Sequence, residues 1–205
     1  MAGRYHSPRR EAAAQATRAA ILQHARTLFL AQGYCATTVS DIAHAAQVAT
    51  PTVYSSTGGK AAMFAELLQP AIRDPLAAQE ASAALQAGDP REVMTHCAAA
   101  ARHGQERNWD LVTTLLRQPP QDEPARQAVA DIADGCLTAL TRIARHLTRL
   151  DALAPGIDTA HATDTLWYYF GHNSWHSLII ERGWSFDQAE PWLLDAATHA
   201  LLAQP

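Results

Sequence analysis

The chain has 205 residues, of which 48% are hydrophobic and 18% charged, and its formal net charge is −4. This length permits one large domain or two small ones with a sizeable core. No apolar run reaches the roughly 18 residues of a membrane span, and the start MAGRYHSPRR lacks the apolar stretch of a secretory signal. Three cysteines without CxxC spacing argue against a disulfide framework or zinc site. We therefore expect a cytoplasmic protein with buried, reduced thiols and no membrane partner.

The charge is divided unevenly along the chain. Residues 1–60 contain six Lys and Arg against two Asp and Glu, a net +4, whereas residues 61–205 carry −8. A basic amino-terminal quarter on an acidic body is typical of a protein whose first segment alone meets a polyanion. Chance segregation of surface charge is the alternative interpretation.

Apolar residues recur at helical spacing almost throughout, which predicts an all-α fold. The first helix is predicted over 11–32, and Gly33 ends it. Its apolar face consists of Ile21, Ala25, Leu28 and Phe29.

Residues 37–60, TTVSDIAHAAQVATPTVYSSTGGK, predict two short helices with a tight turn between them. Thr38 and Asp41 have the spacing of a capping box at the start of the first. Thr50 is expected to cap the second, with Pro51 at the first helical position. Small hydroxyl residues and a tyrosine follow on an outward face, where they can approach base edges and phosphates. They are Thr52, Tyr54 and Ser55. The pattern predicts a helix-turn-helix.

Lys60 is expected at the amino terminus of a fourth helix. A cation there opposes the helix dipole at a cost of roughly 0.3–1 kcal/mol. A DNA phosphate at that corner would explain the position, and a solvated lysine is the alternative. Pro70 and Pro75 interrupt this helix and mark the junction between head and body.

The body continues with predicted helices after Asp89–Pro90, around 109–116 and from Glu123–Pro124 onward, with a polar break at 118–123. A further helix is predicted from its cap Asp158 to Arg182, and a last one over 187–202. The helix over 158–182 is apolar nearly all round, which indicates burial from both sides. One side can face a second copy of the chain, with the last helix completing a bundle between subunits; a central helix in a monomeric core fits the periodicity equally well.

His172 and His176 lie four residues apart, so one metal ion could bind both. No glutamate follows His172 and no third ligand is evident, so we predict no metal and no cofactor. A polar patch in a ligand pocket or at a subunit contact is the preferred interpretation. Aromatic side chains of the body could line such a pocket. The candidate ligand-binding residues are Trp109, Tyr169, His172, Trp175 and His176.

The chain resembles TetR-type transcriptional regulators, closely over about the first seventy residues and in outline beyond. The resemblance is carried by Ile21, Ala25, Leu28-Phe29, Gly33-Tyr34, Thr37-Thr38, Ile42-Ala43, Ala46, Val48, Thr52-Val53-Tyr54 and Lys60. It implies a homodimer with a small-molecule pocket in the body. The family usually has glycine where Gln47 stands and often an aromatic residue where Thr57 stands. By the resemblance, Thr38 contacts phosphate, Thr50, Pro51 and Thr52 face bases, and Tyr54 and Lys60 hold the DNA backbone.

The sequence thus predicts a three-helix helix-turn-helix domain over 1–59 and a larger helical effector-binding and dimerisation domain over 60–205. We expect no enzyme, but a homodimeric repressor that a small-molecule effector releases from its double-stranded DNA operator. The fourth helix is expected to transmit the effector signal. The alternative is a metal-binding or ligand-binding protein or enzyme with a vestigial head. The candidate DNA-binding residues are Thr37, Thr38, Thr50, Pro51, Thr52, Tyr54, Ser55 and Lys60.

Overall fold

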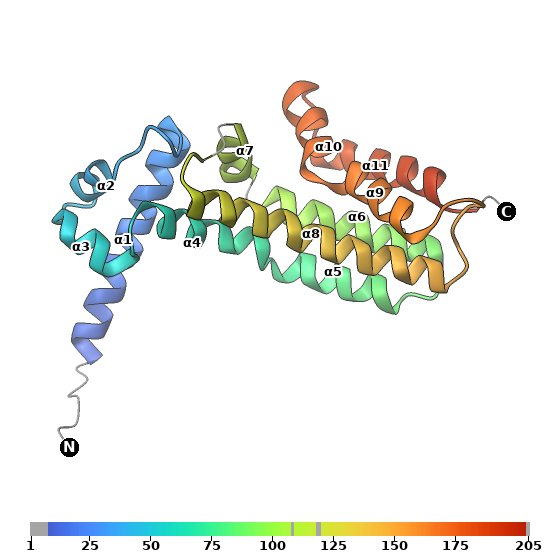
Figure 1. Cartoon of the computed structure of the whole chain (residues 1–205), viewed down its shortest axis with the longest axis horizontal. Coiled ribbons are helices and arrows are strands. Elements are labelled where there is room, and N and C mark those ends of the chain that lie inside the picture. Colours follow the sequence, from blue (N-terminus) through green and yellow to red (C-terminus); the bar gives the residue numbers. More distant parts are fainter. Residues whose placement is uncertain (1–7, 108, 118–119, 204–205) are drawn as a thin grey trace, which may run out of the picture. The chain divides into compact units, whose positions relative to one another are not determined.

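The computed structural model describes residues 8–107, 109–117 and 120–203, and confirms the all-α fold class (Figure 1). The elements are α1 Pro8–Gln32, α2 Val39–Ala45, α3 Thr50–Thr57, α4 Lys60–Ile72, α5 Pro75–Gln86, α6 Pro90–Glu106, α7 Trp109–Arg117, α8 Glu123–Arg149, α9 Thr159–Phe170, α10 His172–His176, the π-helix η1 Ser177–Glu181 and α11 Phe186–Leu201. Within the described ranges the only strand-like pairing is an isolated bridge between Leu153 and Leu202. The polar break predicted at 118–123 lies partly outside the described residues.

The residues form two compact units. One comprises residues up to Gln69 together with Asp110–Val129, and the other comprises Pro70–Trp109 and the residues from Ala130 onward. The first contains the helix-turn-helix and the second contains most of the larger helical body. The boundary at 59/60 expected from the sequence stays a prediction.

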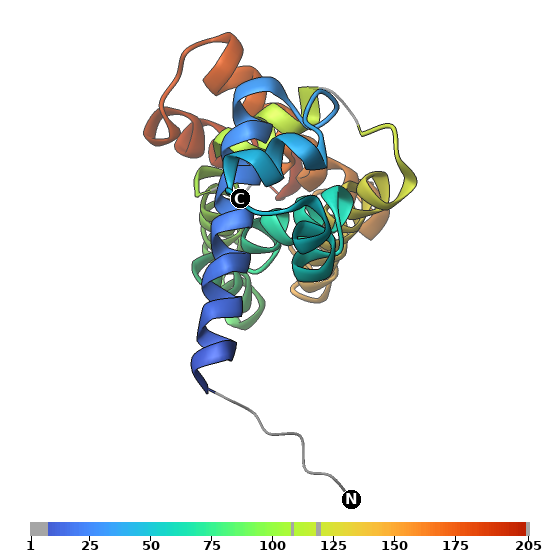
Figure 2. The ribbon, with the colours of Figure 1, turned by 90° about the vertical axis from the view of Figure 1, so that its left-hand side faces the viewer.

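In the first unit, α1, α2 and α3 contact one another pairwise and enclose a small core (Figure 2). Ile21, Ala25 and Phe29 of α1 are fully buried, which confirms the apolar face predicted for this helix. Phe29, Tyr34 and Phe64 form a three-ring contact with centroids 4.5–6.2 Å apart. Burial of such apolar surface is the main stabilising contribution for so small a helix cluster.

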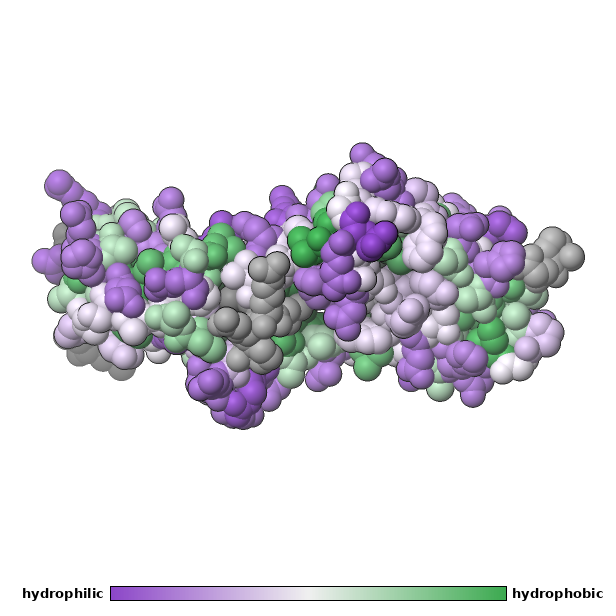
Figure 3. All heavy atoms as spheres, turned by 90° about the horizontal axis from the view of Figure 1, so that it is seen from above, coloured by the Kyte–Doolittle hydropathy of each residue, from purple (hydrophilic) through white to green (hydrophobic). Residues whose placement is uncertain are grey.

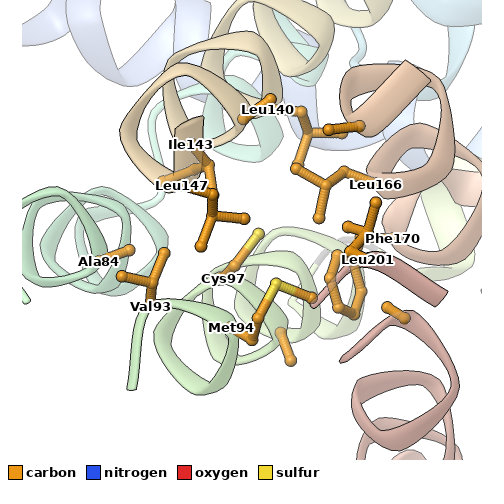
Figure 4. Packing of buried hydrophobic residues seen from close by; sticks show 14 of the residues in the cluster. Ala84, Val93, Met94, Cys97, Leu140, Ile143, Leu147, Leu166, Phe170 and Leu201 are labelled. Atoms are coloured by element: carbon orange, nitrogen blue, oxygen red, sulfur yellow. The ribbon is translucent and has the colours of Figure 1, made fainter. Parts of the chain in front are cut away.

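The second unit is built around a continuous apolar core. Its buried side chains come from α5, α6, α8, α9 and α11, and Figure 4 shows them converging around Met94 and Cys97 of α6. Helix α5 pairs with α6, and α11 contacts both α6 and α9. Cys97 is buried and Cys136 half-buried, but Cys35 is exposed, so the expectation that all three thiols are buried is wrong for Cys35.

The long helix predicted over 158–182 is interrupted at Gly171. Asp158 caps α9 as expected, but Gly171 has an extended conformation and separates α9 from α10. A Cβ atom at Gly171 would lie 2.4 Å from the carbonyl oxygen of Trp167, so a larger residue does not fit without a shift. The chain then continues into η1, which buries none of its residues. Helical periodicity alone could not reveal this break.

The surface seen from above in Figure 3 carries separate hydrophobic patches among hydrophilic residues. Of the described helices, none has the length and apolarity needed to cross a membrane.

Candidate nucleic-acid interface

The first motif helix, α2, begins with the predicted capping box. Thr38 Oγ1 accepts the backbone N–H of Asp41 at 3.1 Å, and Asp41 Oδ2 accepts the backbone N–H of Thr38 at 2.9 Å. The Thr38 hydroxyl also donates to Asp41 Oδ2 at 2.7 Å. These bonds lower the pKa of the Asp41 carboxyl. Thr38 is exposed, but a phosphate would compete with Asp41 for its hydroxyl proton.

Gln47 takes the place of the usual glycine without a change in the geometry of the turn. Its φ is +54°, in the left-handed region that glycine adopts most readily. The backbone N–H of Gln47 donates to His44 and that of Val48 donates to Ala43, at 3.1 and 3.0 Å. This pair of bonds is the Schellman arrangement, which satisfies the last carbonyls of α2.

The second motif helix, α3, is capped by Ala49, so the expectation that Thr50 caps it is wrong. The Ala49 carbonyl accepts the N–H groups of Thr52 and Val53 at 2.8 and 3.3 Å. Thr50 is therefore the first helical residue, and Pro51 the second. The exposed hydroxyl of Thr50 is therefore not used as a helix cap and is available for contacts at the surface.

Helix α3 has sharply different inner and outer faces. Val53 is fully buried and Thr57 nearly so, its hydroxyl donating to the Val53 carbonyl at 2.9 Å. A threonine therefore fills the position where the family often has an aromatic residue. Thr52 is half-buried. The exposed residues of this helix among the predicted contacts are Thr50, Pro51, Tyr54 and Ser55.

Tyr54 is 55% exposed, and one edge of its ring lies close to the backbone of Gly59. A Cβ atom at Gly59 would lie 3.1 Å from Tyr54 Cε1, and Gly59 has a φ of +102°. Glycine is thus required at 59 both by backbone conformation and by the ring beside it. The ring is held near the start of α4.

The Lys60 side chain is directed to the turn that follows α1. Its Nζ donates to the carbonyl oxygens of Tyr34 and Thr37, both at 3.0 Å, and lies 4.2 Å from the centroid of the Tyr34 ring. Two carbonyls and an aromatic face compensate the cation at this helix start. The position of Lys60 therefore has a structural explanation that needs no phosphate.

Thr37 is placed in the interior. It is fully buried, its hydroxyl donates to the Gly33 carbonyl at 2.8 Å, and Gln32 Nε2 donates to it at 3.2 Å. Its side chain thus closes the turn between α1 and α2 and is not on the outer surface.

Four of the five candidate ligand-binding residues come together in the second unit, where Phe186 joins them. The ring contacts run from Trp175 to Phe186 (5.6 Å), from Phe186 to Trp109 (5.3 Å), from Trp109 to His172 (5.5 Å) and from His172 to His176 (5.8 Å). We call these five residues the ring cluster. Tyr169 is the exception, since its ring contact is with Tyr168 at 5.1 Å.

His172 is held in its neutral form. Burial, and secondarily the neighbouring His176, lower the pKa of His172 to about 4. Its Nδ1 lies 3.0 Å from Gln105 Oε1, to which the Nδ1–H tautomer donates. In the described part of the chain, His, Cys, Asp and Glu nowhere gather in a group of three that could bind a metal ion.

An open cleft lies elsewhere in the second unit. It has a volume of about 350 Å³ and is lined by residues of the α6 amino terminus, including Asp89 and Arg91, and of the α11 end, including Asp195 and His199. None of the predicted ligand-binding residues lines it. Because this cleft is open and mixed in charge, the ring cluster is the better candidate site.

The sequence patterns missed several residues that position these sites. Tyr34 Oη donates to Asp122 Oδ2 at 2.7 Å, and Arg26 donates to Asp110 Oδ2 at 2.7 Å, both within the first unit. Burial and this carboxylate raise the pKa of the Tyr34 hydroxyl. Residues 26 and 110 are too far apart in sequence for any local pattern to pair them.

The family model described as "Bacterial regulatory proteins, tetR family" matches residues 21–67. These residues run from the buried face of α1 through the motif helices into α4. Over this segment the chain matches the TetR family. The matched segment contains the helix-turn-helix of α2 and α3, the DNA-binding part of bacterial regulators of this kind.

Solved structures resemble this chain over nearly its whole length. NalD, the secondary repressor of the MexAB-OprM multidrug efflux pump of Pseudomonas aeruginosa, is 26% identical, with a TM-score of 0.74 over 92% of this chain and 96% of NalD. The regulator PfmR of Thermus thermophilus is 25% identical, with a TM-score of 0.62 over 90% and 95%. SmeT, the repressor of the SmeDEF pump of Stenotrophomonas maltophilia, is 18% identical, with a TM-score of 0.67 over 93% of each chain. No curated protein sequence matches the chain.

Proposed function

We propose that this protein is a homodimeric transcriptional repressor of the TetR family that leaves its operator when a small molecule binds the helical body. The single observation that carries the DNA-binding part is the outer face of α3, where exposed polar residues project from a helix whose inner face is locked in the core. NalD, the relative at 26% identity, is itself a repressor.

We propose α3 as the recognition helix. Thr50 and Pro51 stand at its amino end, the part of a recognition helix that meets base edges. Ser55 and Tyr54 follow on the exposed face, where their hydroxyls suit base edges or phosphate. Thr52 is half-buried and contributes at the margin. Thr38 remains a candidate phosphate contact, whereas the buried Thr37 is assigned a structural role.

We propose that a second copy covers the exposed aromatic residues of α9 and α11. Trp167, Tyr168 and Trp192 are 37%, 70% and 51% exposed, and the two helices that carry them contact each other. Large exposed apolar side chains grouped in this way mark interaction surfaces. A twofold dimer would present two α3 helices to half-sites about 34–36 Å apart, one turn of DNA.

We propose the ring cluster as the effector site. Its four predicted members, the full burial of Trp175 and the partial burial of the others support this assignment. The signal has three covalent routes to the first unit, through α4, through the peptide bond between Trp109 and Asp110, and through α8 at Val129–Ala130. Asp110 is paired with Arg26 of α1. If the second route operates, Asp110→Asn speeds hydrogen exchange of α1 amides near Arg26; unchanged exchange argues for α4 or α8.

A metal-binding or enzymatic function is the rival proposal. His172 and His176 support it by their spacing, but Gln105 already occupies His172 Nδ1. Tight metal uptake that His172→Ala abolishes, with no binding to native DNA, would favour the rival.

The test is a gel shift with the DNA that flanks the protein's own gene, repeated over a range of salt concentrations. Specific binding should weaken steeply with salt. Thr50→Ala should relax base preference at one or two positions, with a loss of about tenfold on the preferred site. Thr95→Ala, an exposed threonine of α6, is the matched control. Equal affinity of the native protein for operator and unrelated DNA would overturn the proposal.

A further inference from the structure

Trp175 holds the one buried polar side-chain atom that lacks a hydrogen-bond partner among the described residues, its indole Nε1. The residue is fully buried. Buried indole N–H groups usually have an acceptor, and an unsatisfied donor in the interior is destabilising. Because every other buried side-chain donor and acceptor in the described part is satisfied, this one calls for an explanation at its own site.

The Trp175 ring packs against another aromatic ring. Its centroid lies 5.6 Å from that of the Phe186 ring, and the two planes are tilted by 31°. The Trp109 ring contacts the Phe186 ring edge-on, at an interplanar angle of 83°. These rings favour a flat aromatic ligand. Such a ligand can take the place of one ring in a ring–ring contact and stack on the other with a similar energy.

The charged groups near the ring cluster carry an excess of negative charge, with one arginine against four carboxylates. Arg102 of α6 donates to Glu106, Asp187 and Glu190 at 2.9, 2.6 and 2.9 Å, and so ties α6 to the start of α11. Glu181 accepts the Ser177 hydroxyl at 2.9 Å and lies 3.8 Å from His176 Nδ1. The low pKa of His172 keeps its ring neutral near pH 7. An anionic ligand would find no free cation among these groups and would lose its hydration.

We propose that the ring cluster binds a flat aromatic molecule that has a hydrogen-bond acceptor and no negative charge, and that Trp175 Nε1 donates to this acceptor. The inference rests on the proposed function, because it names the class of the effector. The ligand separates rings that touch in the present structure. The segment 171–181 can accommodate this separation, because it is a helix apart from α9 and its second half, η1, buries no residue. Single π-helical turns of this kind occur often at functional sites.

The test uses three probes of nearly equal shape. Quinoline is flat, uncharged at pH 7.5 and has a ring nitrogen acceptor; naphthalene lacks the acceptor; 2-naphthoate adds a negative charge. Titration calorimetry on the full-length protein should show quinoline binding about fivefold more tightly than naphthalene, the ratio that one ordinary hydrogen bond supplies. 2-Naphthoate should bind more weakly than either.

The variant Trp175→Phe keeps an aromatic ring and removes the donor. It should bind quinoline and naphthalene equally, whereas Trp184→Phe, a tryptophan outside the ring cluster, should keep the fivefold preference. Failure of all three probes to bind, tighter binding of 2-naphthoate, or an unchanged preference in Trp175→Phe overturns the proposal. If Trp175→Phe does not fold, the order of the three probes on the unmodified protein still decides. Operator binding in the gel shift is measured on the same preparations, so failure of this site and failure of the repressor function are distinguishable.

Discussion

At the scale of single residues, Lys60 joins two parts of the DNA-binding unit. Its ammonium group spans the carbonyl oxygens of Tyr34 and Thr37, and its stem rises from the start of α4. The turn after α1 is therefore fixed to α4 by charge-assisted hydrogen bonds, which are stronger than neutral ones.

Lys60→Met should lower the free energy of unfolding by about 1–2 kcal/mol, because two carbonyl oxygens lose a charged donor at a half-buried position. Urea denaturation measures this loss, and Lys60→Arg should restore part of it. The salt dependence of operator binding separates this role from a phosphate contact. If Lys60 contacts a DNA phosphate, its loss reduces the slope of log affinity against log salt concentration by about 0.9. An unchanged unfolding free energy would contradict the structural role.

His172 gives the fold a defined pH dependence. Its pKa is about 4 in the folded chain, against about 6.5 when unfolded. Between these values the unfolded chain binds a proton that the folded chain does not, so stability is complete above pH 6.5 and falls as the pH is lowered toward 4. His172→Phe should reduce this fall by about 1–2 kcal/mol, a figure lowered to allow for partial solvent screening. Urea midpoints at pH 7 and pH 4.5 measure it; an identical fall in the variant contradicts the assignment.

At the scale of elements, the break between α9 and α10 sets the position of the ring cluster. If α9 continued without a break, each residue would be rotated by about 100° about the helix axis from the residue before it. This rotation would fix the direction of the Trp175 side chain. The extended Gly171 resets that direction.

Gly171→Ala should destabilise the protein by about 2 kcal/mol or more, because the new Cβ atom meets the Trp167 carbonyl at 2.4 Å. Gly135→Ala is the matched control. It lies in α8, where a Cβ atom meets nothing within 4 Å, and should raise stability by roughly 0.5–1 kcal/mol. Thermal unfolding of the two variants in parallel makes the comparison. Equal melting temperatures would show that the close approach is readily relieved.

At the scale of the whole molecule, the dimer proposal predicts that the exposed aromatic residues of α9 and α11 set the oligomeric state. The double variant Tyr168→Glu, Trp192→Glu should convert a dimer to monomers, because carboxylates buried in such an interface have no partner. Analytical ultracentrifugation measures this, with Leu76→Glu on α5 as a control at an equally exposed apolar position. Operator affinity should fall when dimerisation is lost, because a single α3 reads only one half-site. A monomer in the unmodified protein would remove the basis of the dimer proposal.

The sequence by itself determined the local structure of the head. The capping box at Thr38 and the proline at the start of α3 depend on residues within five positions of one another, so the sequence predicts them. The left-handed conformation of Gln47 was left open by the sequence and is known from the structure. The all-α fold followed from periodicity for the same reason. Only the tertiary structure decided where Lys60 points, that Thr37 is interior, and which rings of the body meet. Those outcomes depend on pairs such as Lys60 with Tyr34 and Trp109 with His172, which are distant in sequence and are brought together by burial of the helices that carry them.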